Sequence, residues 1–319
     1  MHTSRLAAVS GWIRVTALAS IASLLASPAQ AQSLLDESFG VQKVAGDCLF
    51  TEGPVVDAQG TLFFSDGRNN RILQRTVDGQ VSEFRKPSGR ANGLTLDHEG
   101  RLLLCQSSGD GGGRRVTRLE KDGTETVLAA TYEGKPFNAP NDICVDPRGL
   151  IYFTDPNFGS PSDATQPHAG VYRIRAPGKV ELVIADLGRP NGIAVTPDGQ
   201  TLYVSDRLTQ RLHRYAIREN GDVQPAGIVY DFAPDRGIDG MRLDEQGNIW
   251  AAAGQDRTTG LFVISPAGKL LLHKPMPEFS TNLAFGGPDR RDLFFTATTS
   301  VYHLRTTVAG LPTPTSREK

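Results

Sequence analysis

Residues 191–206 read NGIAVTPDGQTLYVSD, two apolar runs separated by a turn that contains Pro, Asp and Gly. The pattern is typical of a β-hairpin, because these three residue types favour turns and the flanking runs are rich in β-branched and aromatic residues. Asn191 does not fit a simple apolar strand, since it places a polar amide at the start of the first run. The importance of this amide depends on how often the chain repeats the arrangement.

The chain contains six copies of this hairpin. Their sequences are EGPVVDAQGTLFFSD from Glu52, NGLTLDHEGRLLLC from Asn92, NDICVDPRGLIYFTD from Asn141, NGIAVTPDGQTLYVSD from Asn191, DGMRLDEQGNIWAA from Asp239 and NLAFGGPDRRDLFFT from Asn282. Successive copies start 40, 49, 50, 48 and 43 residues apart. Five copies have a glycine eight residues after the start, in a turn that favours a positive φ, and the sixth has Arg290 there.

A period of about 40–50 residues made of short strands is the signature of a β-propeller. Each copy supplies an inner strand, a second strand and a third strand, and an outer strand is expected to follow. The expected outer strands are 81–84, 125–129, 180–185, 227–232 and 269–273. No such strand follows the sixth copy, so we expect residues 39–45 to supply it. The sequence predicts an all-β, six-bladed propeller whose N-terminal strand closes the last blade and leaves no open edge.

The N-terminal residues are expected to lie outside the propeller. Arg5 and Arg14 precede an apolar run over 15–26, which ends in a small-residue cleavage site, Ser-Pro-Ala-Gln-Ala. The run is shorter than the roughly 20 apolar residues of a membrane span. A disordered cytoplasmic tail is the alternative to this signal peptide. The predicted division is a signal peptide over 1–31, a propeller over 32–310 and a flexible tail over 311–319, in an exported, periplasmic protein.

The composition argues against several classes of partner. The chain has 34 Lys and Arg against 35 Asp and Glu, a formal net charge of −1, and no basic tract, which argues against nucleic acid. No later segment is apolar enough to span a membrane. Cys48, Cys105 and Cys144 are widely spaced, unlike a metal-binding CxxC pair, so buried thiols are expected. The sequence leaves open whether Cys105 and Cys144 pair, and it does not give the oligomeric state.

The polar residue at the start of each copy has a geometric meaning in a propeller. The inner strands line the central channel, so their first residues converge near the axis. All six carry a side-chain oxygen: Glu52, Asn92, Asn141, Asn191, Asp239 and Asn282. Asn and Asp could simply cap the start of each strand, but capping would not require Glu52 or an oxygen in every copy. The sequence therefore predicts a ring-shaped site on the axis.

Two carboxylates and several amide oxygens, without Cys or His, offer a cation only hard oxygen ligands. Ca²⁺ takes roughly six to eight such ligands in irregular geometry, so one divalent ion, Ca²⁺ first, is the expected cofactor. Mg²⁺, Mn²⁺ and Zn²⁺ are the alternatives. A metal with open positions polarises a carbonyl, and a carboxylate beside it can act as general base. The ring therefore indicates a hydrolase of small esters or lactones.

The segments TEGPVVDAQGTLFFSD, RANGLTLD, NAPNDICVDPRGLIYFTDPNFG, RPNGIAVTPDGQTLYVSD, GIDGMRLDEQGNIW and NLAFGGPD together resemble the gluconolactonase branch of the gluconolactonase/SMP-30/luciferin-regenerating-enzyme family, over about residues 46–305. The resemblance implies a six-bladed propeller that hydrolyses lactones with a divalent ion, commonly calcium, on its axis. It also implies that Glu52, Asn191 and Asp239 are metal ligands. Asn141 would lie on or near the metal and the substrate. Asp239 would be the general base, with Glu52 able to share this work.

One departure from the family concerns the substrate. Animal members carry an arginine at the position of Ala139, so the substrate must be anchored elsewhere. The rim of the same face is expected to contain Arg90, Tyr132, Arg189, Arg236, Asp66, Arg68, Asp155, Phe158, His168, Asp206, Arg207 and Arg257. The substrate-binding residues predicted from the ring and the rim are Asn141, Asn92, Asn282, His168, Arg90 and Arg207. His168 lies in the long loop 155–170, a candidate lid, although a solvated loop histidine is the alternative.

The predicted function is metal-dependent hydrolysis of a sugar lactone of the glucono-1,5-lactone type to the aldonic acid. The partner is then a small-molecule lactone. Two alternatives stay open at this point. The same scaffold could hydrolyse another lactone, an ester or a phosphotriester, or the chain could be a non-catalytic binding propeller with structural calcium, because a propeller fold does not by itself imply catalysis.

Overall fold

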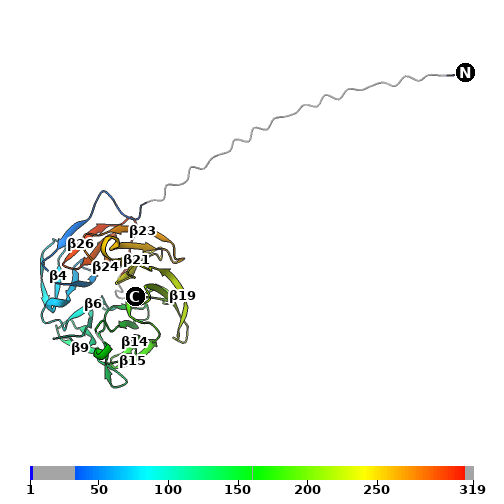
Figure 1. Ribbon diagram of the computed structural model, residues 1–319. Coiled ribbons are helices and arrows are strands. Elements are labelled where there is room, and N and C mark those ends of the chain that lie inside the picture. The colour runs from blue at the N-terminus through cyan, green and yellow to red at the C-terminus, as the bar shows by residue number, and fades with distance from the viewer. Residues whose placement is uncertain (3–32, 160, 313–319) are drawn as a thin grey trace. The chain divides into compact units, whose positions relative to one another are not determined.

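Six four-stranded antiparallel sheets form the fold in the computed structural model, which describes residues 1–2, 33–159 and 161–312. The chain divides into two units, Met1–Gln32 and Ser33–Lys319, and in the second unit the sheets surround a central axis as blades (Figure 1). This confirms the predicted all-β, six-bladed propeller. The predicted signal peptide beyond its first two residues, and positions 313–319 of the predicted tail, lie outside the described residues.

The first five blades run outward from the axis in chain order, and the sixth takes its outer strand from the N-terminal end of the chain. The inner strands are β2 (Thr51–Val56), β6 (Ala91–Leu96), β12 (Ile143–Val145), β16 (Pro190–Val195), β20 (Met241–Leu243) and β24 (Ser280–Gly286). The second strands are β3 (Leu62–Asp66), β7 (Leu102–Gln106), β13 (Ile151–Asp155), β17 (Thr201–Asp206), β21 (Ile249–Ala253) and β25 (Asp292–Ala297). The inner strands contact one another in the cyclic order β2, β6, β12, β16, β20, β24, which closes the ring around the axis.

Two further strands complete each blade. The third strands are β4 (Arg71–Arg75), β8 (Arg115–Leu119), β14 (Gly170–Ala176), β18 (Arg211–Ile217), β22 (Gly260–Ile264) and β26 (Ser300–Arg305). The outer strands are β5 (Val81–Arg85), β9 (Glu125–Ala129), β15 (Lys179–Ile184), β19 (Val223–Asp231), β23 (Leu270–Pro275) and β1 (Gln42–Ala45). The connections contain the hairpin β10 (Thr131–Tyr132) and β11 (Lys135–Pro136), and the 3₁₀ helices η1 (Gly67–Asn69), η2 (Pro161–Asp163) and η3 (Asp256–Thr258). No helix of the described ranges is long and apolar enough to cross a membrane.

The N-terminal strand closes the ring, as predicted. Strand β1 pairs antiparallel with β26, with Gln42 opposite His303 and Lys43 opposite Tyr302. The preceding residue Leu35 forms an isolated bridge with Thr306 and is buried in the core of the sixth blade. The edge of β26 is therefore covered by a segment from the other end of the chain, which leaves this strand no free edge for pairing with another molecule.

Repeated turns join the inner and second strands on one face. In the first blade, Asp57 Oδ1 accepts hydrogen bonds from the backbone N–H groups of Gln59 and Thr61, and Gly60 has φ +83°. Arg290 occupies the left-handed region of the sixth turn with φ +55°, so this turn keeps its shape without a glycine there. The turns fix the register of each hairpin, and the register decides which residue opens each inner strand.

The core lies between neighbouring blades. Trp250 is fully buried, packs edge-on against Phe285 and donates from Nε1 to Asp244 Oδ2 at 2.8 Å. The three cysteines, Cys48, Cys105 and Cys144, are free thiols, so the pairing that the sequence left open is absent. Burial raises the pKa of Cys105 above its ordinary value, which fits an inert thiol packed in the core.

Candidate active site

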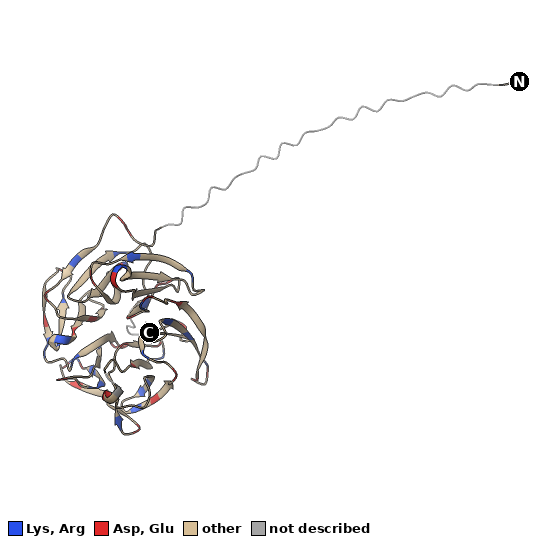
Figure 2. Cartoon of the chain, viewed as in Figure 1, with Lys and Arg blue, Asp and Glu red and all other residues tan. Residues whose placement is uncertain are grey.

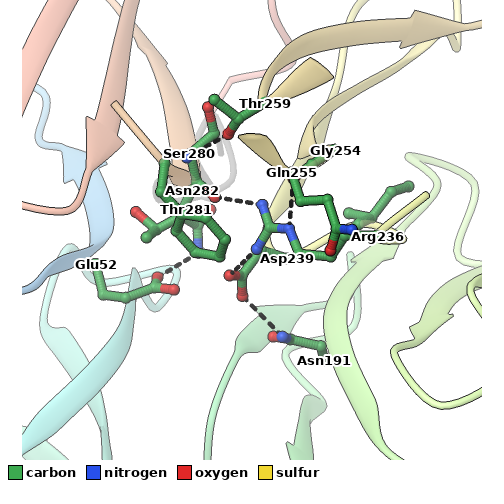
Figure 3. Close-up of polar contacts among 12 residues, drawn as sticks. Glu52, Asn191, Arg236, Asp239, Gly254, Gln255, Thr259, Ser280, Thr281 and Asn282 are labelled. Carbon is green, nitrogen blue, oxygen red and sulfur yellow. Dashed lines mark hydrogen bonds and ion pairs between the residues drawn. The ribbon is translucent and has the colours of Figure 1, made fainter. Parts of the chain in front are cut away.

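The six ring residues lie at or just before the starts of the inner strands. Glu52, Asn92, Asn191 and Asn282 belong to β2, β6, β16 and β24, while Asn141 and Asp239 each stand two residues before their strand. Five of the six side chains are buried, and Asn92 is half-buried. Figure 3 shows Glu52, Asn191, Asp239 and Asn282 converging from four different blades.

Irregular backbone turns these residues toward the axis. The pairing of the inner and second strands shifts register between Glu52 and Val55 in the first blade, and between Pro190 and Ile193 in the fourth. A register shift of this kind bends a strand and re-aims a side chain. The convergence of the ring residues therefore depends on the bulge as well as on their place at the strand start.

The glycine after the ring residue allows neighbouring blades to meet. Gly93 donates its N–H to Asn141 O at 2.7 Å, and a Cβ on Gly93 would lie only 2.4 Å from that same oxygen. Real Cβ atoms do not approach a backbone oxygen this closely, so only glycine fits. The dipeptides EG, NG and DG in the repeats thus have a structural reason, which sequence analysis did not supply.

Hydrogen bonds couple the two ring carboxylates to ring amides. Asn191 Nδ2 donates to Asp239 Oδ1 at 2.7 Å, and Asn282 Nδ2 donates to Glu52 Oε2 at 3.0 Å (Figure 3). The N–H of Gly53 also donates to Glu52 Oε2, at 2.8 Å. The structure therefore brings together Glu52, Asn191, Asp239 and Asn282 as two carboxylate–amide pairs.

The axis holds an excess of buried negative charge. Burial raises the pKa of Glu52 well above its ordinary value, and the negative charges of Asp239 and Asp142 raise it further. Burial also raises the pKa of Asp142, which is fully buried just after Asn141. Carboxylates that repel one another in a buried site favour either a shared proton or a bound cation.

Arg236, which the sequence predicted only as a rim residue, contacts a ring carboxylate in the structure. Its Nη1 lies 2.8 Å from Asp239 Oδ2, and its Nε donates to Gly254 O at 2.7 Å. The guanidinium also lies 3.9 Å from the centre of the Phe279 ring. The only signal in the sequence was a basic residue three positions before Asp239. Its burial against an aromatic ring depends on the packing of two blades, which no local pattern reveals.

The donor set of the ring fits a divalent cation. Asn141 Oδ1 is buried and has no hydrogen-bond partner among the described residues, an arrangement that leaves an amide oxygen available as a ligand. The described residues contain no cluster of three or more His, Cys, Asp or Glu side chains that could hold a metal. Carboxylate and amide oxygens from Glu52, Asn141, Asn191 and Asp239 would therefore have to act together.

Three aspartates expected on the rim have a structural role. Asp155 is buried, and its two oxygens accept hydrogen bonds from the N–H groups of Asn138 and Ala139 at 2.8 and 2.7 Å. Asp66 and Asp206, at the same position of their blades, hold the loops before β2 and β16 in the same way. These carboxylates hold the backbone two or three residues before a ring residue.

The remaining predicted substrate-binding residues are less buried than most of the ring residues. The side chains of Arg90 and Arg207 are half-buried, and that of His168 is exposed. The loop 155–170 is anchored beside His168, because Asn138 Nδ2 donates to His168 O at 3.1 Å. Gln166 is buried in the same loop and donates to Lys135 O at 2.8 Å. The part of this candidate lid around His168 is thus tied to neighbouring segments.

Comparisons with known proteins agree with the geometry. Residues 50–299 match the family described as SMP-30/Gluconolactonase/LRE-like region. The gluconolactonase of Zymomonas mobilis subsp. mobilis is 32% identical over 87% of this chain and 84% of that protein. Lactonase drp35 of Staphylococcus aureus is 32% identical over 65% of this chain and 64% of its own length. The solved structure of a gluconolactonase from Xanthomonas campestris has a TM-score of 0.74 and 32% identity, covering 83% of this chain and 89% of that one. The resemblance seen in the sequence is confirmed, and the chain belongs to the SMP-30/Gluconolactonase/LRE-like family.

Proposed function

We propose that this protein hydrolyses a sugar lactone of the glucono-1,5-lactone type to its aldonic acid at the axial ring. The observation that carries the proposal is the pair of buried carboxylates, Glu52 and Asp239, each held by a ring amide on the axis. Family membership and relatives named gluconolactonase and lactonase support the same reaction class. A binding propeller with structural calcium would also use these two carboxylates, so hydrolysis itself is the property that separates the two functions.

The proposed cofactor is one divalent cation, Ca²⁺ in the first place. Glu52, Asn141, Asn191 and Asp239 would hold it, because they offer hard oxygens and the buried Asn141 Oδ1 lacks another partner among the described residues. When bound, such an ion supplies Lewis acidity that polarises the lactone carbonyl.

The residues of the chain would perform the remaining steps. A ring carboxylate, Asp239 or Glu52, accepts a proton from water while the water oxygen bonds to the carbonyl carbon. The tetrahedral intermediate then breaks its bond to the ring oxygen, and the same carboxylic acid returns the proton to that leaving oxygen. Arg236 and Asn191 hold the two oxygens of Asp239 during this cycle. Asn92 and Asn282 present amides to the substrate hydroxyl groups.

Acid release from glucono-1,5-lactone tests the proposal, after subtraction of spontaneous hydrolysis. The chain from residue 32 is stripped of metal and supplied separately with Ca²⁺, Mg²⁺, Mn²⁺ or Zn²⁺. The expected result is metal-dependent release that Asp239→Asn abolishes, with metal binding followed independently by calorimetry. The matched control is Asp198→Asn, an exposed carboxylate on the opposite face of the fourth blade, which should keep full activity. Calcium binding without hydrolysis of any lactone, ester or phosphotriester would overturn the proposal in favour of a binding propeller.

We propose also that the chain is exported to the periplasm and cleaved after Ala31. The arginines and the apolar run before a small-residue site support this. N-terminal sequencing of the protein from a periplasmic fraction is expected to begin at Gln32, and recovery of the intact N-terminus from the cytoplasm would refute it.

A further inference from the structure

We infer that the lactone taken by this site carries an anionic group, a phosphate or a carboxylate, which Arg189 and Arg207 bind beside the ring. The inference rests on the proposed lactone hydrolysis and narrows its substrate class. Glucono-1,5-lactone itself is neutral, so we expect it to be a poorer substrate than a lactone that carries an anionic group.

The two arginines lie opposite each other at the end of the fourth blade. Strands β16 and β17 pair with Pro190 opposite Asp206, so the residues just beyond them, Arg189 and Arg207, face each other across the hairpin. The N–H of Arg207 donates to Arg189 O at 2.9 Å, which fixes the two backbones together. Asn191 of the ring follows Arg189 by two residues. The pair therefore lies on the same face as the ring, on the blade that supplies Asn191.

The side chains of both arginines remain close to the site. Both are half-buried, and the guanidinium of Arg189 lies 5.6 Å from the centre of the Phe158 ring in the loop of the third blade. Partial burial lowers the pKa of Arg207, and the negative charge of Asp239 opposes this effect. The positive charges of Arg236 and Arg189 lower the Arg207 pKa further. Arg207 is thus near enough to the ring to sense both members of the Arg236–Asp239 ion pair.

Neither arginine has a carboxylate partner. Within the described ranges, Arg189 and Arg207 form no ion pair, whereas the buried Arg236 is paired with Asp239. Asp206, the residue before Arg207, is occupied by the N–H groups of Arg189 and Leu208 and by Thr209 Oγ1. Like charges held together in a half-buried place are unfavourable unless an anion joins them.

The charge balance of the whole site favours the same conclusion. A divalent ion on the ring would balance Glu52 and Asp239. Arg242 Nη1 lies 3.9 Å from Asp142 Oδ2 and balances this third carboxylate, which leaves the guanidiniums of Arg189, Arg207 and Arg236 in excess. Elsewhere on the blades, both signs of charge are interspersed (Figure 2). A guanidinium offers donors only and matches the oxygens of phosphate or carboxylate in a bidentate manner. A neutral polyol would use these donors less well.

The test compares three lactones: glucono-1,5-lactone, its 6-phosphate, and glucaro-1,5-lactone, in which a carboxylate replaces the terminal alcohol. We expect kcat/KM for one of the two anionic lactones to exceed that for the neutral lactone by roughly tenfold or more. Added salt should reduce this ratio of anionic to neutral kcat/KM. Arg207→Gln and Arg189→Gln should each lower the ratio several-fold, and Arg207→Lys should restore part of it. The matched control is Arg214→Gln, an exposed arginine on β18 of the same blade, which should leave the ratio unchanged.

Binding of the products separates this inference from the proposed function. Calorimetry with gluconate, 6-phosphogluconate and glucarate measures the preference without turnover, and which anion binds more tightly distinguishes phosphate from carboxylate. Tight anion binding without hydrolysis of any lactone would refute the proposed function. Hydrolysis with equal affinity for gluconate and for the two products that carry a second anionic group, or an equal fall in kcat/KM for neutral and anionic lactones in Arg207→Gln, would overturn the inference alone.

Discussion

Arg236 and Asp239 form a buried ion pair across a single turn of chain, with 2.8 Å between Arg236 Nη1 and Asp239 Oδ2. Because Asn191 Nδ2 binds the other carboxylate oxygen at 2.7 Å, the Asp239 side chain is fixed from two sides. The Arg236 guanidinium is fixed in turn by Gly254 O and by the face of Phe279. The orientation of the proposed base thus depends on a residue that need not touch the substrate.

We expect Arg236→Met to lower the free energy of unfolding by about 3–5 kcal/mol, because it leaves a buried carboxylate without its partner. It should also lower kcat more than it changes KM, since Asp239 loses its fixed orientation. Urea unfolding and lactone kinetics measure the two effects. Arg236→Lys keeps the charge but loses the fork of contacts, so it should recover only part of the stability.

The control for this variant is an ion pair of similar length on the surface. Arg211 Nε lies 2.9 Å from Asp231 Oδ2, and both side chains are more than 40% exposed, at 43% and 44%. Arg211→Met should cost less than about 1 kcal/mol. Similar losses of unfolding free energy in Arg236→Met and Arg211→Met would show that the buried Arg236–Asp239 pair stabilises the fold no more than the exposed pair does.

Gly53→Ala should prevent the ring from forming. Gly53 has φ +49°, and a Cβ there would lie 2.1 Å from Asn92 O. The backbone of two blades would have to separate beside Glu52, so we expect a loss of several kcal/mol in stability and of nearly all activity. Gly100→Ala is the matched control, because Gly100 also has a positive φ, +72°, but an added Cβ meets nothing within 4 Å. Its cost should stay near 1 kcal/mol, as judged by the same urea titration.

The fold could be predicted because its determinants are local and repeated. A turn such as Asp57–Gly60 and an apolar run of fixed length identify a hairpin, and six copies at one period identify the ring. The closing strand followed from counting, since the sixth copy lacked an outer strand. The polar residue at each strand start then placed the ring residues on the axis without any knowledge of their contacts.

The contacts within the site could not be predicted, because they depend on packing between blades. The sequence predicts both Arg236 and Asp155 on the rim of the same face. In the structure, Arg236 pairs with a ring carboxylate, whereas Asp155 accepts hydrogen bonds from backbone N–H groups. Whether a side chain faces the axis or a loop depends on the bulges and on the neighbouring blade. The need for glycine at position 93 likewise arises from a carbonyl oxygen of the next blade.

Asp155 should make stability depend on pH. Burial raises its pKa to about 7, and the hydrogen bonds from Asn138 and Ala139 only partly oppose this. The folded state therefore binds the Asp155 proton more tightly than the unfolded state does. The stabilisation that comes from this proton is complete below about pH 4 and is lost as the pH rises to about 7. The full effect is at most about 4 kcal/mol.

The measurement is the difference in unfolding free energy between the wild type and Asp155→Asn, from urea titrations between pH 4 and pH 8. The Asn variant has no proton to lose, so the advantage of the wild type should shrink as the pH rises. Parallel profiles would mean that Asp155 has the same pKa in the folded and unfolded states. Asp198→Asn, exposed and on the opposite face, serves as the control.

Closure of the ring by the N-terminal strand predicts a strong effect of truncation. Removal of residues 33–45 together with the preceding residues deletes β1, exposes the edge of β26 and removes Leu35, which is 3% exposed, from the core. Loss of a buried leucine alone costs about 2–5 kcal/mol, and the open edge should promote association. We expect a lower urea midpoint and aggregation in size-exclusion chromatography. A chain that begins at Ser33 keeps all of these contacts and should unfold at the wild-type midpoint. Equal midpoints for the two truncations would show that β26 does not need its partner, and that the sixth blade is stable with three strands.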